Sequence, residues 1–381
     1  MIVSRIAEAK ARQLLGSFKS LAIMGPRQSG KTTLARHCFP EKPYVSLENP
    51  VYRNFALTDP QGFLAQYPQG AILDEIQRAP ELLSFLQQKL DEGEGKFVLT
   101  GSNNLLLLDQ ITQTLAGRVA YLELLPFSVE ETEAASGSKA VDRLLLEGSY
   151  PSVQAEGVAP QDWFLAYVRT YVERDVRQIR NIDNLLLFER FLSLCAGRVG
   201  QQVNFSNLAT ETGIDLKTAQ GWLGILQASY ILFLLPPYYQ NFNKRVTKSP
   251  KLYFYDTGLA AFLLGIRRPD ELALHPYRGP LFENWILLEL IKNRFNRGER
   301  SNLYYWKDAS CEIDALIANG SGVTPVEIKS GQTIHADYFK CLHYWNRLTG
   351  HPGGLVFYAG TEKQIRSNEI AVLPWREVRE W

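Results

Sequence analysis

The strongest chemical signal in the sequence is the glycine-rich run GPRQSGKT, Gly25 to Thr32, which matches the phosphate-binding pattern G-x-x-x-x-G-K-[ST] without a mismatch. Gly25 and Gly30 allow the backbone to curl so that successive N–H groups face phosphate oxygens, and a following helix adds the positive end of its dipole. In this pattern Lys31 reaches the β- and γ-phosphates, and the hydroxyl of Thr32 ligates Mg²⁺. The run therefore predicts a nucleoside triphosphate site. We expect it to be lined by Gly25, Pro26, Arg27, Gln28, Ser29, Gly30, Lys31, Thr32 and Thr33.

An acidic pair, Asp74 and Glu75, follows the apolar residues Ala71 to Leu73. A short strand that ends in two carboxylates is what the metal side of a triphosphate site needs. Asp74 is therefore the predicted Mg²⁺ ligand beside Thr32, directly or through water, and Glu75 is the predicted catalytic base that polarises the attacking water.

Small polar side chains follow another apolar stretch, in Phe97-Val-Leu-Thr-Gly-Ser-Asn-Asn104. Ser102 or Asn103 could orient the water between Glu75 and the γ-phosphate, and we place Asn103 among the catalytic residues. An ordinary turn with a helix cap is the alternative.

An arginine, Arg118, ends the segment Leu115-Ala-Gly-Arg118 just before a predicted strand. An arginine here could reach the γ-phosphate of its own or a neighbouring subunit and stabilise charge in the transition state. A plain surface arginine is the alternative, and Arg174 in YVERDV is a second candidate.

The C-terminal third holds a second set of charged residues. Glu327 and Lys329 lie at positions i and i+2 of one predicted strand and so share a face, and Asp314 lies on the preceding strand. This set resembles the PD-(D/E)XK nuclease core, which implies that Asp314 and Glu327 hold Mg²⁺ while Lys329 polarises the water or steadies the oxyanion. Glu283, on a predicted helix, could add a further carboxylate. A salt bridge at a strand edge, or a nuclease-like module kept for interaction, are the alternatives.

The N-terminal elements that must position the triphosphate site alternate between strand and helix, which is typical of a parallel sheet covered on both faces. An amphipathic helix is predicted over residues 3–15, with Arg5 among its polar residues. The predicted strands are Leu21 to Met24, Tyr44 to Leu47, Ala71 to Leu73, Phe97 to Thr100 and Val119 to Leu124. The polar segment Glu130 to Lys139 is the predicted first boundary.

The middle of the chain predicts three helices between Phe188 and Leu226, with Ser206 and Asp215 as caps of the second and third and Gly213 as a turn. A hairpin follows, so the order of elements is that of a winged helix. Its loop, NFNKRVTKSPK, supplies the cations that suit DNA phosphates, whereas the predicted recognition helix has only Lys217. These wing cations are Lys244, Arg245, Lys248 and Lys251. A solvated loop, or a small ATPase lid, is the alternative.

The composition excludes several other classes of protein. Lys and Arg number 41 and Asp and Glu 40, so nucleic-acid contact needs a local patch. The four cysteines are widely separated, which argues against a disulfide framework and a zinc module. Apolar runs such as Ile231 to Leu235 are too short to cross a membrane. We therefore expect a reduced cytoplasmic enzyme without a membrane partner.

The motifs together resemble the prokaryotic AAA-type P-loop ATPases in which an uncharacterised C-terminal region follows the ATPase core. The resemblance in the core rests on GPRQSGKTTLA, LDEIQ, LTGSNN, LAGR followed by LPFS, EGSYPSV and YVERDV. In the C-terminal region it rests on KSPKLYFYDTGL, FENW and VEIKSG. It covers nearly the whole chain and implies an ATP-dependent enzyme in which Lys31, Thr32, Asp74 and Glu75 have their usual roles.

We therefore predict an α/β chain of three parts: an AAA-type core over residues 1–135, a helical and winged-helix region over 136–268, and a restriction-endonuclease-like domain over 269–381. The predicted function is hydrolysis of ATP to ADP and phosphate with Mg²⁺, coupled to conformational work on DNA. An ATP-switched signalling or defence scaffold that acts on a protein partner, and a DNA-binding regulator with a nuclease-like module, are the alternatives. A homo-oligomer is compatible with all three.

Overall fold

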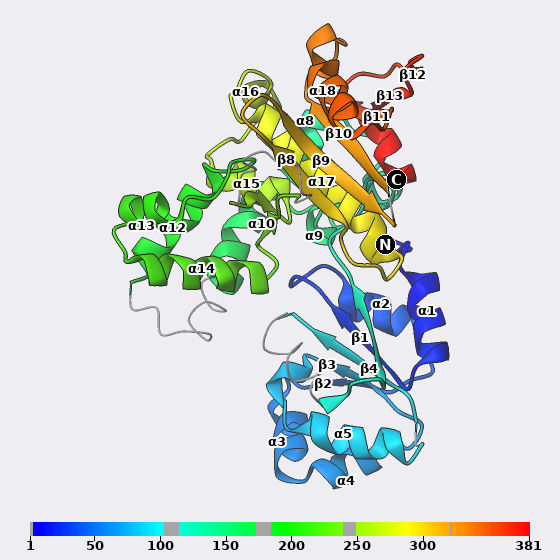
Figure 1. Cartoon of the computed structure of the whole chain (residues 1–381). Helices are drawn as coiled ribbons and strands as arrows, with labels where there is room; N and C mark the ends of the chain where they lie inside the picture. The colour runs from blue at the N-terminus through cyan, green and yellow to red at the C-terminus, as the bar shows by residue number, and fades with distance from the viewer. Residues whose placement is uncertain (1–2, 94, 103–113, 173–183, 239–248, 321) are drawn as a thin grey trace. The chain divides into compact units, whose positions relative to one another are not determined.

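The computed structural model in Figure 1 describes residues 3–93, 95–102, 114–172, 184–238, 249–320 and 322–381. The chain divides into two compact units, which are described separately. The first consists of Met1–Phe127 with Ala228–Tyr230 and Arg294–Glu299, and the second of Ser128–Gln227, Ile231–Asn293 and Arg300–Trp381. Among the described residues, no helix combines the length and the apolar character that a membrane crossing requires.

The first unit is built on a five-stranded sheet in the order β2-β3-β4-β1-β5, in which all the pairs are parallel. The strands are β1 (Ser20–Met24), β2 (Tyr44–Ser46), β3 (Ile72–Asp74), β4 (Phe97–Gly101) and β5 (Val119–Glu123). The helices are α1 (Glu8–Ser17), α2 (Lys31–Cys38), α3 (Pro50–Thr58), α4 (Pro60–Ala65) and α5 (Leu82–Asp91), with a 3₁₀ turn η1 (Ile76–Arg78). The predicted parallel α/β sheet is confirmed.

Alternation along the strands divides the apolar side chains of this sheet between two cores. Leu21 and Ile23 of β1 pack in one cluster with residues of α1 and α2. Ala22 and Met24 lie in the other cluster, which includes residues of α4 and α5. Because neighbouring side chains of a strand point to opposite faces, a continuous apolar strand can be covered by helices on both sides.

The second unit begins with helices. These are α7 (Val129–Ser136), α8 (Val141–Glu147), α9 (Pro151–Gln154), α10 (Pro160–Tyr167), η2 (Val168–Val172), α12 (Leu185–Ala196), α13 (Phe205–Thr212) and α14 (Leu216–Ala228). The predicted boundary at Glu130 to Lys139 falls largely within α7, because Ser128 and Glu131 form a capping box that starts a helix there. The unit boundary lies just before that cap, at Phe127.

The caps of the helical region agree with the sequence in part. Asp215 accepts the Thr218 N–H at 2.9 Å, and Gly213 ends α13 with a left-handed φ of 86°, as predicted. The predicted cap at Ser206 is wrong, because Asn204 caps α13 by accepting the Asn207 N–H at 3.0 Å. Asparagine and serine have the same capping chemistry, so the sequence does not separate the two positions. The antiparallel hairpin of β6 (Leu232–Leu235) and β7 (Lys251–Phe254) follows.

The C-terminal part of this unit holds a mixed six-stranded sheet in the order β12-β13-β11-β10-β9-β8. Its strands are β8 (Leu303–Lys307), β9 (Glu312–Asn319), β10 (Gly322–Lys329), β11 (Gly354–Tyr358), β12 (Gln364–Ile365) and β13 (Ile370–Pro374). Its helices are α15 (Thr257–Leu263), α16 (Pro269–Ala273), α17 (Arg278–Asn296) and α18 (Lys340–Thr349), with η3 (Ala336–Phe339) and η4 (Trp375–Glu380). In α17, Leu281, Ile286 and Leu287 are fully buried.

Candidate functional site

The glycine-rich loop joins the carboxyl end of β1 to the start of α2. Gly25 lies so close to the neighbouring strand end that a Cβ there would be 2.1 Å from the carbonyl oxygen of Leu124. Gly30 caps α2 with a left-handed φ of 94°. Glycine is required at both positions, for closeness at the first and for backbone conformation at the second.

The two groups predicted to handle phosphate and metal lie at the start of α2. Lys31 is buried, and its ammonium donates to the carbonyl oxygens of Gly25 at 3.0 Å and Pro26 at 2.6 Å. The ammonium therefore lies against the loop that would surround the phosphates. The hydroxyl of Thr32, one residue on, donates to Asp74 Oδ1 at 2.8 Å, so the predicted metal residues are brought together.

Asp74 ends β3 and is held by hydroxyl groups from several elements. Besides Thr32, Thr100 at the end of β4 donates to Oδ1, and Tyr44 of β2 donates to Oδ2 at 2.9 Å. Burial, with the nearby charge of Asp74, raises the pKa of Tyr44 to about 12, so the phenol keeps its proton and remains a donor. Sequence reasoning did not include Tyr44 and Thr100. Thr100 lies near the carboxyl end of β4, whereas Tyr44 begins β2, in register with Ile72, and reaches Asp74 with its long side chain.

Glu75 has a φ of 57°, a left-handed conformation that is uncommon for a residue other than glycine. Its carboxylate accepts from Gln77 and from the hydroxyl of Ser102 at 3.2 Å, and its N–H donates to Thr100 at 3.3 Å. Ser102 thus lies where the sequence placed it, beside the acid, whereas the other candidate, Asn103, lies outside the described residues. Gln77 belongs to the LDEIQ motif, but the sequence did not assign it a role.

Arg5 joins the site from the N-terminal segment, where the sequence predicted only a polar helix surface. Its guanidinium is buried and donates to the carbonyl oxygens of Ser29, within the glycine-rich loop, at 2.8 Å and of Leu125 at 2.7 Å. It lies before α1, whose first residue is Glu8. Only the folded chain brings residue 5 beside residues 29 and 125, so no local pattern could have indicated this contact.

Arg118 lies at the amino ends of the parallel strands, whereas the glycine-rich loop lies at their carboxyl ends. This arginine immediately precedes β5, its carbonyl oxygen accepts the N–H of Ser20 at the start of β1, and its guanidinium pairs with Asp91 at 2.6 Å. The loop follows Met24, at the opposite end of β1, roughly 16 Å along the strand. Arg118 therefore lies away from its own chain's loop, and its assignment to a γ-phosphate, of its own or a neighbouring subunit, stays a prediction. Arg174 lies outside the described residues.

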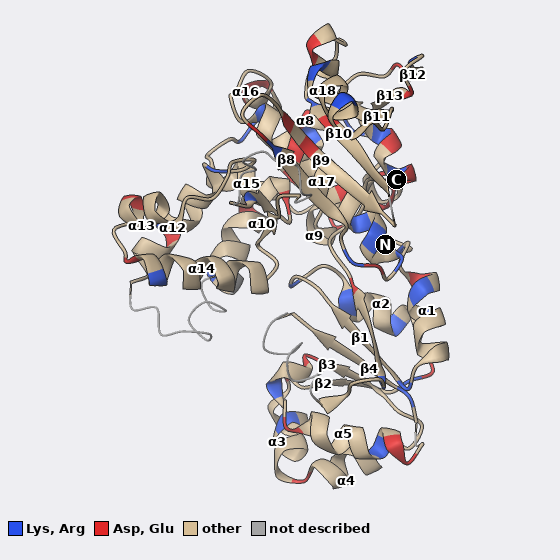
Figure 2. Ribbon diagram, in the orientation of Figure 1, with Lys and Arg blue, Asp and Glu red and all other residues tan. Residues whose placement is uncertain are grey.

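A second polar cluster lies on the C-terminal sheet. In the antiparallel pair of β9 and β10, Val326 faces Ala315, so Glu327 faces Asp314 one position further along. The ammonium of Lys329 lies 3.2 Å from Asp314 Oδ2 and 2.7 Å from Glu327 Oε2. The three predicted side chains therefore converge. Figure 2 shows acidic residues gathered where β8 and β9 lie beside α17.

The two carboxylates of this cluster differ in charge state. Glu327 is buried, and burial together with the nearby Asp314 charge raises its pKa to about 9. Burial also opposes ionisation of Asp314, but Lys329, Lys251 and the N–H of Ile328 outweigh it and lower the pKa of Asp314. The oxygen Oε1 of Glu327 is buried and has no hydrogen-bond partner in the described part of the chain.

Glu283, from α17, faces the same cluster through a different partner. It accepts from Tyr253 and from Lys251 at 3.1 Å, both on β7, and Lys251 also pairs with Glu312. Burial, partly offset by Lys251, raises the pKa of Glu283. The assignment of Lys251 to an exposed wing is wrong, because the residue is 3% exposed. The other wing cations, Lys244, Arg245 and Lys248, lie outside the described residues.

Two further findings limit the choice of sites. Within the described residues, no group of three or more His, Cys, Asp or Glu side chains is arranged so that it could hold a metal ion.

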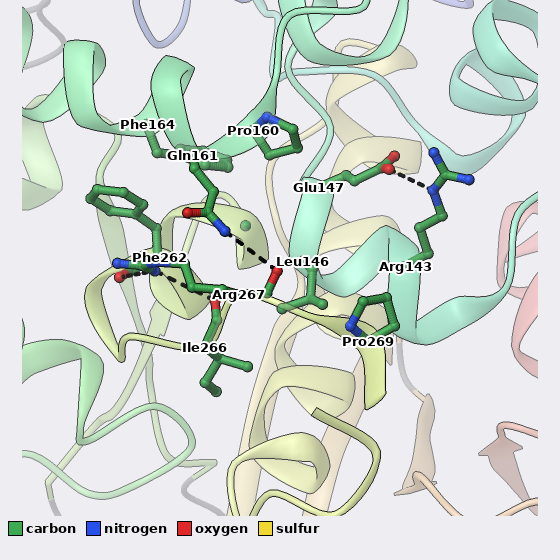
Figure 3. Close-up of a pocket in the computed structure, with 11 residues that line it drawn as sticks. Arg143, Leu146, Glu147, Pro160, Gln161, Phe164, Phe262, Ile266, Arg267 and Pro269 are labelled. Atoms are coloured by element: carbon green, nitrogen blue, oxygen red, sulfur yellow. Dashed lines mark hydrogen bonds and ion pairs between the residues drawn. The ribbon is translucent and has the colours of Figure 1, made fainter. Parts of the chain in front are cut away.

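A cavity of 250 Å³ lies in the helical region and is shown in Figure 3. It is lined by Arg143, Leu146, Glu147, Pro160, Gln161, Phe164, Gly258, Phe262, Ile266, Arg267 and Pro269. None of the predicted site residues lines it.

Comparison with known proteins identifies three matched segments. Residues 17–133 match the AAA domain, residues 138–270 a domain of unknown function (DUF8612) and residues 278–378 another (DUF4143). The uncharacterized protein Rv2008c of Mycobacterium tuberculosis is 31% identical over 342 residues, which cover 87% of this chain and 75% of the relative. The uncharacterized protein MJ1544 of Methanocaldococcus jannaschii is 25% identical over 332 residues, covering 78% and 72%. The Walker-type ATPase PABY2304 of Pyrococcus abyssi aligns with a TM-score of 0.47 at 14% identity, covering 69% of this chain and 96% of that one.

Proposed function

Because the chain belongs to the family of AAA-domain proteins that includes Rv2008c, we propose that it binds ATP with Mg²⁺ and hydrolyses it to ADP and phosphate. The observation that carries the proposal is the approach of Thr32 Oγ1 to Asp74 Oδ1, 2.8 Å, beside a loop with the complete phosphate-binding pattern. A hydroxyl and a carboxylate are hard oxygen donors that suit Mg²⁺. When bound, Mg²⁺ would neutralise charge on the β- and γ-phosphate oxygens.

Each residue then has a role that follows from its position. The backbone N–H groups of the loop residues other than Pro26 would bind the phosphate oxygens at the positive end of α2, and Lys31 would exchange its carbonyl partners for phosphate oxygens. Glu75 would accept the proton of the attacking water. Gln77 and Ser102 hold its carboxylate in place, which fixes the direction from which the water is activated.

The target that we propose for this ATPase is DNA, on which it would do conformational work. The support is the order α12, α13, α14, then the hairpin of β6 and β7, which is the order of a winged helix, together with the cationic loop between those strands. ATP turnover is to be measured with and without duplex, branched and single-stranded DNA. Stimulation by DNA is expected.

The same measurement separates the alternatives. A rate of ATP turnover that is the same with and without DNA, together with a co-purifying protein, would favour an ATP-switched signalling or defence scaffold. Tight sequence-specific DNA binding that ATP only toggles would favour a DNA-binding regulator. No phosphate release under any of these conditions would contradict the ATPase itself.

A second candidate function, metal-dependent cleavage of DNA, is favoured by the buried Oε1 of Glu327, which has no partner in the described residues. We propose that Asp314 and Glu327 would hold a divalent cation in a restriction-endonuclease-like domain, with Lys329 beside the attacked phosphate. The test is incubation of labelled DNA with Mg²⁺ or Mn²⁺. Cleavage that Asp314→Ala abolishes would support a nuclease, and no cleavage of any DNA form would leave a nuclease-like fold kept for binding.

A further inference from the structure

Two arginines of the first unit approach a single carboxylate oxygen beside the glycine-rich loop. Arg27 is the third residue of that loop, and its Nη1 lies 3.9 Å from Oε1 of Glu48. Arg78 ends η1, and its Nη2 lies 3.8 Å from the same oxygen. Because both guanidiniums lie within reach of one oxygen, the side chain of Arg78 is brought next to the loop that would hold the phosphates.

The backbone places Arg78 directly after the acidic pair. The turn η1 follows Glu75 without a gap, and the N–H of Arg78 donates to the carbonyl oxygen of Glu75 at 2.9 Å. Glu48 lies beside the same strand end, since the N–H of its neighbour Leu47 donates to the carbonyl oxygen of Asp74 at 3.0 Å. Arg78 therefore lies next to both parts of the proposed ATP site, the loop and the acidic pair.

The contacts that hold the two guanidiniums at Glu48 are easily exchanged. Both distances are longer than that of a charge-assisted hydrogen bond, and the side chain of Glu48 is 51% exposed. An ion pair of this kind contributes little free energy. A terminal phosphate offers three oxygens and more negative charge, and the planar guanidinium binds phosphate through two parallel N–H groups. Phosphate oxygens should therefore displace Glu48.

We propose that Arg78, together with Arg27, contacts the γ-phosphate of ATP bound by the same chain, and that Glu48 holds both guanidiniums until the nucleotide binds. This role rests on the proposed ATP hydrolysis and adds to it the residues that distinguish ATP from ADP. The two arginines would stabilise the charge that develops on the phosphate oxygens. The sequence indicated Arg118 for such a role, and Arg78 can fill it within one chain.

The test compares the affinities of the full chain for ADP and for the β,γ-methylene analogue of ATP, each with Mg²⁺, by calorimetry. The analogue is not hydrolysed, so the measurement is independent of turnover. The central variant is Arg78→Ala, and Arg78→Lys keeps the charge without the planar group. Arg12→Ala is the matched control, because this arginine donates to the carbonyl oxygen of His37 at 3.2 Å, near the carboxyl end of α2 and away from the loop.

Arg78→Ala should bind the ATP analogue about tenfold more weakly and ADP nearly unchanged, because only the analogue has a γ-phosphate. Arg78→Lys should lie between that variant and the parent, and Arg12→Ala should bind both nucleotides like the parent. An unchanged ratio of the two affinities in Arg78→Ala would overturn the role of Arg78 and leave the proposed ATPase standing. A parent chain that binds neither nucleotide would overturn both.

A merely structural role for Arg78 would lower stability without changing that ratio. Thermal unfolding without nucleotide checks the fold of each variant. If Arg78→Ala does not unfold cooperatively, Arg78→Gln takes its place, because it keeps a polar side chain and removes the charge. The same change in the ratio is expected, and its absence would overturn the role of Arg78.

Mixing two inactive variants tests whether the arginine acts within its own chain. Arg78→Ala should lower phosphate release by about 10²-fold or more, and Lys31→Ala should not bind the nucleotide. If Arg78 acts in its own chain, a mixture of these two variants should stay inactive, because neither chain has a complete site. Restored phosphate release in the mixture would overturn the assignment to the same chain and would show that the arginine comes from a neighbouring subunit.

Discussion

The P-loop site and the C-terminal cluster both gather buried or half-buried carboxylates, but the two sites differ in the groups that pair with these carboxylates. The donors to Asp74 and Glu75 are hydroxyl and amide groups, from Thr32, Tyr44 and Gln77 among others. Around Asp314 and Glu283 the partners include ammonium groups. Neutral donors hold a carboxylate in place and leave its charge to act on a metal, whereas lysines neutralise it. The comparison indicates that the first site is prepared for a cation that comes with substrate, and the second is largely self-contained.

The largest effect is expected from Lys31→Ala. The change removes the charge that faces the β- and γ-phosphates, so ATP affinity should fall by about a hundredfold or more. Fluorescent-nucleotide titration measures this, with Lys42→Ala, a lysine in the same unit outside the loop, as the control. Retained affinity in Lys31→Ala would contradict the assignment of the loop.

The lysine partners of the second cluster should differ in their contribution to stability. Lys251→Ala removes the buried ammonium that pairs with Glu283 and Glu312, which leaves Glu283 with Tyr253 and Glu312 with Lys307. The change should lower the free energy of unfolding by about 3–5 kcal/mol. Lys307→Ala breaks a half-exposed pair and should cost about 1 kcal/mol or less. Urea unfolding without divalent ions measures both. Equal decreases in the two variants would mean that the burial of Lys251 has no energetic consequence.

The pH dependence of stability should reveal Glu327. Its pKa, about 9 in the folded chain, exceeds the ordinary glutamate value, so the folded state holds a proton that the unfolded state releases. Stability should therefore fall as pH rises from about 4.5 to 9, by up to about 1.4 kcal/mol per pH unit, and level off above. Glu327→Gln should flatten this fall. An identical pH profile in the variant would show that Glu327 titrates normally.

The smallest effect is expected from the loop between β6 and β7. If DNA binds through it, replacing Lys244, Arg245 and Lys248 with alanine should weaken binding to all sequences about equally. The slope of log affinity against log salt should flatten by roughly one unit for each cation that no longer neutralises a phosphate. Titration of duplex DNA at several salt concentrations measures both quantities. Unchanged DNA affinity in the triple variant would mean that the DNA-binding site lies elsewhere in the chain or that the chain does not bind DNA.

The sequence predicted the parts of the first site that are local in the chain. The loop, Asp74, Glu75 and Ser102 are recognisable because each directly follows an apolar strand, and parallel strands bring their carboxyl ends to one edge. Tyr44 and Arg5 were missed because their contacts join distant segments and follow no spacing rule. Arg118 directly precedes β5, as the sequence indicates, so it lies at the amino ends of the parallel strands, and its role toward a γ-phosphate stays a prediction.

In the second unit the sequence predicted which side chains share one face of the sheet, but it did not predict which charged side chains are buried. Glu327 and Lys329 converge with Asp314 because the period of two and the hairpin register fix their side. Lys251 follows a run of cations and so was grouped with an exposed loop. Its burial depends on Glu283 and Glu312, which come from a helix and a strand further along the chain, and no local pattern reports such a pairing.

The central claim is that Glu75 activates the attacking water in an ATPase, and Glu75→Gln tests it most directly. The change keeps the size of the side chain and removes its basicity, so ATP should bind with nearly unchanged affinity. Phosphate release should fall by about 10²- to 10⁴-fold. The control is Glu81→Gln, which changes an exposed acid at the N-cap of α5, and this variant should turn over normally. Binding without turnover in Glu75→Gln is the result predicted here, and normal phosphate release from that variant would contradict the account.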